Sequence, residues 1–274
     1  MNISETRIAI LGAGNIGSAV ARGLVGAGLL PAGHITLTRR KIKGLDELKR
    51  DGFHVTPDNR AALTNADLVF ISVTPQQLNS LLEETRETFD CRRHTVVSLV
   101  SGVTIGEIRT HLGPDIAIVR AMPNLAIAIR ESMTCLATDD SKSRALPPVK
   151  KVFDALGKTL VIDEGLMIPA TALCACGIAF FLRAVRAASQ GGIEIGFHAE
   201  DSLLMAAQTA RGAASLLAKA GNHPEREVDK VTTPQGCTIS GLNQMEHHGF
   251  SSAMIRGIVT SAEKAAALYS TKAM

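Results

Sequence analysis

The chain has 274 residues, with 29 Lys and Arg against 26 Asp and Glu, so its formal net charge is only +3. This near balance disfavours nucleic-acid binding as the main function, because such proteins normally carry a larger basic excess or a basic stripe. Hydrophobic residues make up 46%, which is typical of a globular protein, whereas one Tyr and no Trp leave few aromatic faces for stacking bases or sugars.

The N-terminal stretch Met1–Arg7 has no apolar signal core, and the five cysteines form no C-x-x-C pair. An odd number of thiols suits a reducing compartment better than a disulfide scaffold. Both features predict a cytoplasmic protein. The cysteines are Cys91, Cys135, Cys174, Cys176 and Cys237.

The first 165 residues alternate short apolar runs with amphipathic segments. The runs predict strands at Ile8–Leu11, Ile35–Thr38, Leu68–Val73, Val96–Val100, Ile116–Arg120, Met133–Ala137 and Thr159–Ile162. The intervening segments predict helices that include Ile16–Gly26, Gln76–Thr88, Ile105–Leu112 and Val149–Leu156. Continuous Val, Ile and Leu runs separated by helices are typical of a parallel sheet covered on both faces. We therefore expect an α/β domain over residues 1–164.

After Glu164 the strand pattern ends, and the sequence predicts helices at about 166–195, 199–220, 238–247 and 251–270. We therefore expect an all-helical second domain over residues 165–274. Its apolar stretch Leu166–Leu182 has no charge but is slightly too short to span a membrane, and it contains Pro169. We interpret it as a helix buried in a domain core or a subunit interface, and we predict a dimer with intertwined C-terminal helices and no membrane partner.

A glycine-rich loop follows the first predicted strand and opens the first predicted helix. Its sequence is Gly12-Ala13-Gly14-Asn15-Ile16-Gly17. In this pattern the first Gly permits a tight turn, the second lets the backbone approach a pyrophosphate, and the third allows close packing of helix on strand. The helix N-terminus then directs free N–H groups at the phosphates. The loop predicts a Rossmann-type dinucleotide site.

The end of the second predicted strand indicates which dinucleotide binds. A site for NAD usually places Asp or Glu there, whereas this strand ends Thr38-Arg39-Arg40-Lys41, with Lys43 close behind. A guanidinium can hold a 2′-phosphate in bidentate fashion, so we predict NADP, with NADPH preferred and NADH as the other candidate. The alternative interpretation is a solvated charge run at a strand end.

A second informative stretch, Asp229–Ile239, reads D-K-V-T-T-P-Q-G-C-T-I and precedes a predicted helix. Thr238 sits where that helix would begin. A helix start with a Thr hydroxyl can hold a carboxylate through backbone N–H groups and one side-chain donor. The spacing alone also fits a plain N-cap.

These residues resemble the pyrroline-5-carboxylate reductases of proline biosynthesis, and the resemblance covers essentially the whole chain. The family signature D-x-V-T-S-P-G-G-T-T-I matches Asp229–Ile239, and further matches lie in the first domain. They are Asn59, Val73-Thr74-Pro75, Ser101-Gly102-Val103-Thr104-Ile105 and Met122-Pro123-Asn124. The resemblance implies that Asn59, Val73–Pro75 and Met122–Asn124 bind the cofactor together with Gly12, Gly14, Asn15, Ile16, Gly17, Arg39 and Arg40.

The resemblance implies reduction of 1-pyrroline-5-carboxylate to L-proline, by hydride transfer from NAD(P)H to the cyclic imine carbon. The Gly236–Ile239 backbone, which includes Cys237, is then the candidate for holding the substrate carboxylate, with Cys176 also at the substrate site. Thr238 is the catalytic candidate, as a positioning donor or proton relay, because a Thr hydroxyl is too weakly acidic to be a general acid. We expect no metal, since Cys174 and Cys176 have no nearby His or third Cys in sequence.

The chain departs from the family where an S-G-S-G-P-A-Y stretch usually begins a helix. Here the sequence is Cys174-Ala175-Cys176-Gly177-Ile178-Ala179-Phe180, so both serines, the Pro and the Tyr hydroxyl are gone. Two further departures lie in the signature, at Gln235 and Cys237. A less polar cleft leaves open a paralogue that reduces another cyclic imino acid, or a non-catalytic NADP-binding sensor. Deazaflavin-dependent NADP oxidoreductases share the glycine loop but lack the long helical tail.

Overall fold

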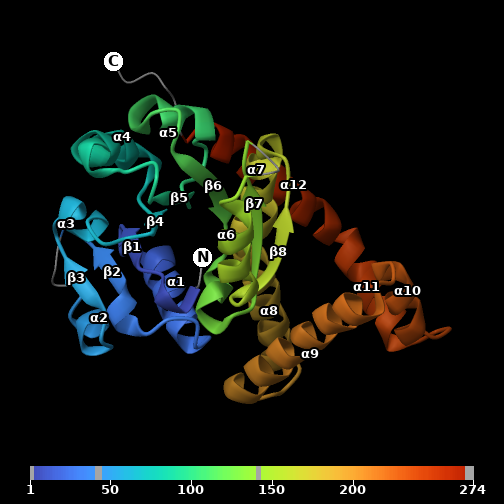
Figure 1. Cartoon of the computed structure of the whole chain (residues 1–274). Coiled ribbons are helices and arrows are strands. Elements are labelled where there is room, and N and C mark those ends of the chain that lie inside the picture. The colour runs from blue at the N-terminus through green and yellow to red at the C-terminus, as the bar shows by residue number, and fades with distance from the viewer. Residues whose placement is uncertain (1–2, 41–44, 140–142, 269–274) are drawn as a thin grey trace. The chain divides into compact units, whose positions relative to one another are not determined.

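The computed structural model of the protein describes residues 3–40, 45–139 and 143–268, and the side chain of Ala220 is left aside (Figure 1). Residues up to Cys176 and from Ser261 onward form one compact unit, and Gly177–Thr260 form a second. We call them the Rossmann unit and the helical unit.

The Rossmann unit alternates strands and helices, as the sequence predicts. Its strands are β1 (Ile8–Leu11), β2 (Ile35–Thr38), β3 (His54–Thr56), β4 (Leu68–Ile71), β5 (Thr95–Ser98), β6 (Ala117–Met122), β7 (Ser132–Ala137) and β8 (Gly157–Val161). Its helices are α1 (Asn15–Gly26), α2 (Asp46–Arg50), α3 (Asn59–Leu63), α4 (Pro75–Thr85), α5 (Ile105–Leu112), α6 (Leu146–Asp154) and α7 (Met167–Ala170). A π-helical turn, Thr171–Cys176, follows α7.

The strands form a single 8-stranded sheet in the order β3-β2-β1-β4-β5-β6-β7-β8. Neighbours are parallel from β3 to β6, so Ile8 lies in register with Ile35 on one side and with Leu68 on the other. The expectation of a wholly parallel sheet is wrong at one edge, because β7 runs antiparallel to β6 and β8 follows the direction of β7. An apolar run carries no information about strand direction, which is why the sequence did not reveal this reversal.

Two apolar clusters cover the two faces of the sheet. Alternate residues of β1 point to opposite faces, so Ile8 and Ile10 join one cluster and Ala9 and Leu11 join the other. The first cluster includes side chains of α1 and α6, and the second includes side chains of α3, α4 and α5. Each fully buried Leu or Ile contributes roughly 1.5–3 kcal/mol through removal of apolar surface from water. The sheet core therefore holds the strand ends, and the loops that follow them, in fixed positions.

The helical unit contains α8 (Gly177–Glu194), α9 (Ala199–Ala220), α10 (Pro224–Val231), α11 (Cys237–His247) and most of α12 (Phe250–Ala266). Helices α8 and α9 pack closely at Gly192, where an added Cβ would clash with the Ser202 Oγ. That hydroxyl donates a 2.6 Å hydrogen bond to the Ser189 carbonyl. The close approach of α8 and α9 thus depends on a glycine and a small polar pair.

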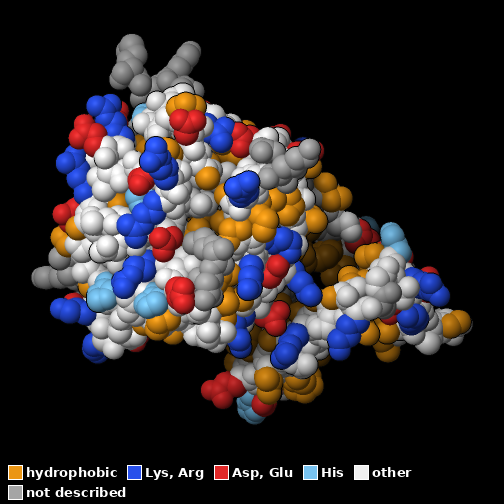
Figure 2. Space-filling model, viewed as in Figure 1, with side chains coloured by type: hydrophobic (Ala, Val, Ile, Leu, Met, Phe, Trp, Pro, Cys, Tyr) orange, Lys and Arg blue, Asp and Glu red, His pale blue; other side chains and the backbone are white. Residues whose placement is uncertain are grey.

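The helical unit buries very little apolar surface within one chain. Among its described residues no hydrophobic side chain is buried, and Ser189 and Ser202 are its buried polar residues. Its exposed large hydrophobic side chains include Phe181, Leu182, Ile195, Phe197, Leu203, Leu204, Leu216, Ile255 and Val259. Figure 2 shows hydrophobic side chains gathered along these helices and over β8. Burial of Leu166–Leu182 in a domain core is therefore wrong for Leu166, Leu173, Phe181 and Leu182, which are exposed, and the subunit-interface interpretation remains.

One stretch, Glu164–Glu194, is long and apolar enough to cross a membrane by length and composition alone, and most of its most apolar part is not buried within one chain. The stretch is not one continuous α-helix, since it runs through α7, the π-helical turn and α8. An exposed apolar helix of this kind also suits an interface between protein chains.

Candidate cofactor cleft and substrate loop

The glycine loop has the geometry that its sequence predicts. Gly12 has φ +102°, and a Cβ there would lie 2.5 Å from the Ser72 carbonyl oxygen. A Cβ on Gly17 would lie 2.5 Å from the Gly12 carbonyl oxygen, so this position allows α1 to lie close to β1. A Cβ on Gly14 would meet no atom within 4 Å, and no side chain caps α1. The loop therefore presents open space and uncapped N–H groups, as an anion site requires.

A cleft of about 790 Å³ opens over this loop at the carboxyl ends of β1, β2 and β4. This is the point at which the strand order reverses, where ligands bind in open α/β sheets. The lining includes seven of the predicted cofactor residues: Gly12, Gly14, Arg39, Arg40, Asn59, Val73 and Thr74. Asn15, Ile16 and Gly17 continue into α1, and Pro75 is the first residue of α4. The structure thus brings residues of the glycine loop, the β2 end and the β4 end to one cleft.

A chain of hydrogen bonds crosses the floor of this cleft. The Thr38 hydroxyl accepts from the Gly12 N–H at 3.3 Å and donates to Asn59 Oδ1 at 2.6 Å. The Asn59 amide nitrogen in turn donates to both Glu84 carboxylate oxygens, at 3.2 and 3.3 Å. The Asn59 side chain is therefore held with its oxygen toward β2. The sequence did not indicate a role for Glu84, because a Glu on the exposed face of a predicted helix resembles any other solvated charge.

The two arginines at the end of β2 are exposed. Arg39 and Arg40 line the cleft, and the described residues offer neither side chain a carboxylate partner. The backbone of Arg39 is held to β3, because the Arg39 N–H donates to the Thr56 carbonyl at 3.4 Å. Lys41 and Lys43, which share the predicted charge run, lie outside the described residues. The cleft thus offers two guanidinium groups to an anion.

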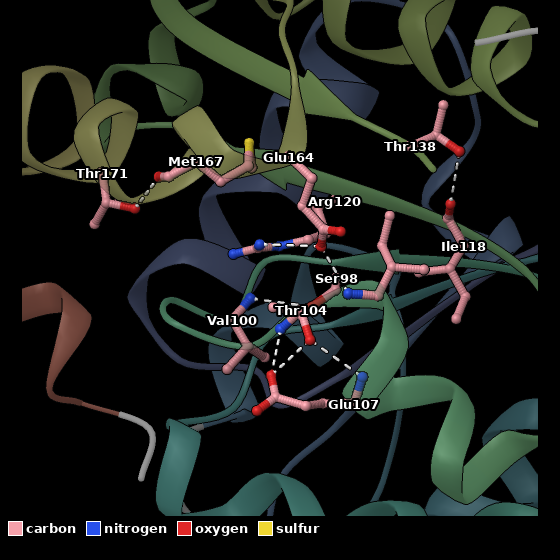
Figure 3. Close-up of polar contacts among 11 residues, drawn as sticks. Ser98, Val100, Thr104, Glu107, Ile118, Arg120, Thr138, Glu164, Met167 and Thr171 are labelled. Carbon is pink, nitrogen blue, oxygen red and sulfur yellow. Dashed lines mark hydrogen bonds and ion pairs between the residues drawn. The ribbon is translucent and has the colours of Figure 1, made fainter. Parts of the chain in front are cut away.

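A buried ion pair lies at the carboxyl ends of β5 and β6 (Figure 3). Arg120 is 3% exposed, and its Nη1 donates to Glu164 Oε1 at 3.2 Å. The same Glu164 oxygen accepts the Ile105 N–H at 2.7 Å, so it also satisfies a donor in the first turn of α5. Burial lowers the pKa of Arg120, and the hydrogen bond to Glu164 opposes this shift. The sequence did not predict this ion pair, because Arg120 resembles an ordinary polar residue at the end of a strand.

The start of α5 is closed by a capping box next to this pair. The Thr104 Oγ1 accepts the Glu107 N–H at 3.2 Å, and Glu107 Oε2 accepts the Thr104 N–H at 2.7 Å. This reciprocal arrangement satisfies two N–H groups that the helix would otherwise leave free. The Ser101–Ile105 loop is therefore held by Glu107 and Glu164.

The Met122-Pro123-Asn124 turn lies outside the cleft lining and is held by protein contacts. Met122 and Pro123 are buried. Asn124 accepts the Ala126 N–H at 3.1 Å, and its Nδ2 donates to the Cys174 carbonyl at 3.4 Å. The turn thus links the end of β6 to the π-helical turn.

The predicted substrate loop lies at the start of α11 and is exposed. The helix begins at Cys237 with Gly236 as its N-cap, so the interpretation of Thr238 as a plain N-cap is wrong. Gly236 suits this position, because a Cβ would lie 2.9 Å from the Thr233 carbonyl oxygen and would also crowd Thr233 Oγ1. Cys237, Thr238 and Ile239 are exposed, and within the described chain nothing hydrogen-bonds the Thr238 hydroxyl. Like the glycine loop, this helix start has no side-chain cap.

The described residues contain no group of three or more His, Cys, Asp or Glu side chains arranged to hold a metal ion. The neighbouring rings of His247 and His248 contact each other edge to face, with centroids 5.3 Å apart.

Comparisons with known families match both parts of the chain. Residues 164–268 match the pyrroline-5-carboxylate reductase dimerisation family, and residues 7–102 match the family described as coenzyme F420-dependent NADP oxidoreductase. The chain therefore carries a dimerisation domain, which supports a homo-oligomer. The second match agrees with the glycine loop, which pyrroline-5-carboxylate reductases share with deazaflavin-dependent NADP oxidoreductases.

Individual relatives give the same result. Pyrroline-5-carboxylate reductase 1 of Dictyostelium discoideum is 52% identical over 99% of this chain, and the chain spans 51% of that protein's length. Pyrroline-5-carboxylate reductase 2 of the same organism is 47% identical, covering 95% of this chain and 92% of that protein.

Solved structures agree with these relatives. A pyrroline-5-carboxylate reductase from Coxiella burnetii has a TM-score of 0.85 at 28% identity, covering 97% of this chain and 99% of that one. The Plasmodium falciparum pyrroline carboxylate reductase, solved with NADP bound, has a TM-score of 0.89 at 22% identity, covering 98% of this chain and 100% of that one. At the latter identity the likeness shows the fold. The two-part fold, the glycine-loop cleft and the relatives together show that this chain belongs to the pyrroline-5-carboxylate reductase family.

Proposed function

We propose that the chain reduces 1-pyrroline-5-carboxylate to L-proline with NADPH as the reductant. The observation that carries the proposal is the cleft over the glycine loop, in a chain whose relatives are pyrroline-5-carboxylate reductases. The match covers 92% of the length of the second Dictyostelium relative but only 51% of the length of the first. The catalytic unit is therefore proposed to lie within these 274 residues.

The cleft fits a dinucleotide phosphate. Space at Gly14 admits a pyrophosphate close to the backbone, and the uncapped start of α1 attracts negative charge. At the end of β2 the chain has Thr38 where an NAD site usually places an acidic residue, and Arg39 and Arg40 are free to hold a 2′-phosphate. When bound, NADPH supplies the hydride for the reduction.

Substrate binding is assigned to the start of α11. Its backbone N–H groups at Cys237, Thr238 and Ile239 have no side-chain cap, so they can hold a carboxylate in the way that helix N-termini hold anions. Thr238 is proposed to position the imine nitrogen or relay a proton to it, since its hydroxyl both donates and accepts. Cys176, at the end of the π-helical turn of the Rossmann unit, is a further candidate for contact with the substrate.

The working form is proposed to be a homodimer built through the helical unit. The exposed large hydrophobic side chains of α8, α9 and α12 lack a covering layer in one chain, and a second copy with the same surface would supply it. A partner copy also explains the apolar Glu164–Glu194 stretch without a membrane. All five cysteines are free, which suits the reducing environment of the cytoplasm.

The proposal is tested by following NADPH oxidation with racemic 1-pyrroline-5-carboxylate, with piperideine-2-carboxylate and NADH run in parallel. We expect fastest turnover with 1-pyrroline-5-carboxylate and NADPH. Faster reduction of piperideine-2-carboxylate would identify a paralogue acting on a different imino acid. Tight NADPH binding without turnover of either substrate would overturn the proposal in favour of a non-catalytic sensor.

A further inference from the structure

Two cysteines from distant parts of the sequence meet inside the Rossmann unit. Cys135 lies on β7 and is 3% exposed. Cys174 lies in the π-helical turn and is half-buried. Both belong to one apolar cluster with Met122, Met167 and neighbouring alanines. The thiols are therefore packed in a water-poor setting that small molecules can reach from the side of Cys174.

The two thiols interact with each other. Cys135 and Cys174 lie in the same apolar cluster, and hydrogen bonding with Cys135 lowers the pKa of Cys174 to about 7. The same hydrogen bond raises the pKa of Cys135, and burial raises it further. Near neutral pH a substantial fraction of Cys174 is therefore thiolate, the form of cysteine that reacts with oxidants, while Cys135 keeps its proton.

We propose that Cys135 and Cys174 are a redox modification site, which a peroxide converts to an intrachain disulfide. In the first step the Cys174 thiolate attacks one oxygen of hydrogen peroxide. The O–O bond breaks, hydroxide leaves and takes up a proton, and Cys174 becomes a sulfenic acid. In the second step the Cys135 sulfur attacks the Cys174 sulfur and loses its proton. The S–S bond forms, the S–O bond breaks, and the hydroxyl leaves as water. Two thiols are thus oxidised while one peroxide is reduced to two waters.

The position of the pair gives the disulfide a structural consequence. The Cys174 carbonyl accepts a 3.4 Å hydrogen bond from Asn124, in the Met122–Asn124 turn. A bond to β7 would fix the π-helical turn from which α8 continues, and with it the side chain of Asn124. Oxidation therefore couples the π-helical turn to β7, the strand next to the edge strand β8.

The chain contains matched controls for this inference. Cys176 is two residues away, is also half-buried and has no thiol partner among the described residues. Cys91 and Cys237 are exposed, so they report general oxidation of accessible thiols. The inference does not rest on reductase activity, since its readout is the chemistry of the thiols.

The test uses the full chain, oxidised with hydrogen peroxide at low molar excess, alkylated, digested and analysed by mass spectrometry. We expect a peptide pair that joins Cys135 to Cys174 and is lost after dithiothreitol. The Cys176→Ser variant should retain the pair, and Cys174→Ser and Cys174→Ala should both abolish it. With Cys135→Ser, whose hydroxyl can still donate to the Cys174 sulfur, Cys174 should instead accumulate sulfenic and sulfinic acid; Cys135→Ala removes that donor, so Cys174 should be oxidised more slowly. Absence of the peptide pair in the wild-type protein, or its replacement by pairs with Cys91 or Cys237, would overturn the inference, whatever the outcome for the variants.

Discussion

The Rossmann unit and the helical unit achieve order in different ways. The Rossmann unit buries long apolar side chains on both faces of its sheet, whereas the described residues of Gly177–Thr260 bury no hydrophobic side chain at all. The contrast extends to the candidate sites. The cofactor cleft is internally bonded through Thr38, Asn59 and Glu84, while the substrate loop at Thr238 is exposed. One chain thus orders the candidate cofactor cleft around a buried core, whereas the candidate substrate loop is exposed in one chain.

The largest effect is expected from adding a negative charge to the exposed apolar surface of the helical unit. Phe181 and Leu204 are 63% and 69% exposed in one chain. If a second copy covers them, Phe181→Asp or Leu204→Asp buries a carboxylate and should raise the dimer dissociation constant by at least about a thousandfold. Analytical ultracentrifugation measures this, and Asn65→Asp, which adds the same charge at an exposed position of the Rossmann unit, is the control. An unchanged dimer in both variants would show that the exposed helices are not the interface.

The next largest effect is expected inside the Rossmann unit, at the Arg120–Glu164 pair. Glu164→Gln leaves the buried guanidinium without a counter-charge and should lower the free energy of unfolding by about 2–3 kcal/mol. Arg120→Met removes the buried charge and leaves Glu164, which is partly exposed and still accepts the Ile105 N–H. It should cost less, about 1 kcal/mol. Urea unfolding of both variants measures the difference, and a larger loss for Arg120→Met would contradict this account.

Thr238→Ala probes the exposed substrate loop. If the hydroxyl positions or relays a proton, turnover should fall by about a hundredfold, at the lower end of what proton-transfer groups contribute. NADPH affinity should stay within about twofold, since Thr238 does not line the cofactor cleft. Steady-state kinetics together with NADPH fluorescence titration separate the two effects. Thr238→Ser, which keeps the hydroxyl, should restore most of the activity. Wild-type turnover in Thr238→Ala would remove Thr238 from the chemistry.

Replacing the two arginines at the end of β2 tests whether they bind the 2′-phosphate of NADPH. The double variant Arg39→Ala/Arg40→Ala should raise the KM for NADPH by about tenfold or more, because each lost charge-assisted contact to a phosphate is worth about 1.5–3 kcal/mol before solvent screening. The KM for NADH should change little, since that cofactor has no 2′-phosphate. Equal changes in both constants would refute the assignment of these arginines to the phosphate.

The smallest effect is a pH dependence confined to the Rossmann unit. His94 is 3% exposed, and burial lowers its pKa below the ordinary 6.5. Its Nδ1 accepts the Asp90 N–H at 3.0 Å, so the folded protein holds it neutral. The unfolded chain binds a proton at His94 as the pH falls below 6.5, and this lowers the free energy of unfolding; above that pH the contribution is constant. Urea unfolding at pH 5 and pH 8 should show a smaller acid loss for His94→Gln than for the wild type, and an equal loss would contradict it.

The sequence predicts those parts of the fold that a strong local pattern marks. Strands β1 and β2 and helices α5 and α9 have the predicted bounds, because each is bounded by clear turn or capping residues. Helices α2 and α3 and strand β3 were missed, since three to five residues carry no readable period. The direction of β7 depends on tertiary packing and leaves no local mark.

The candidate site shows the same division. The glycine loop could be predicted because Gly12 and Gly17 stand where any Cβ would clash, so the backbone itself dictates the residue. Glu84, Arg120 and Glu164 could not, since their roles arise from partners that are 25, 44 and 59 residues away in sequence. Long-range polar contacts of this kind are fixed by the folded arrangement, and a single sequence does not record them.

The helical unit is an insertion with two covalent attachments. The chain leaves the Rossmann unit after Cys176 and returns at Ser261, where Ala265 on α12 is again buried. A protease cut between Gly177 and Thr260 would therefore release neither fragment, because each would keep a segment that belongs to the Rossmann unit. Such a nicked protein would run as two bands on a denaturing gel and as one species in native buffer. The last helix thus belongs to the dimerisation domain and, through its C-terminal end, also ties the chain back to the Rossmann unit.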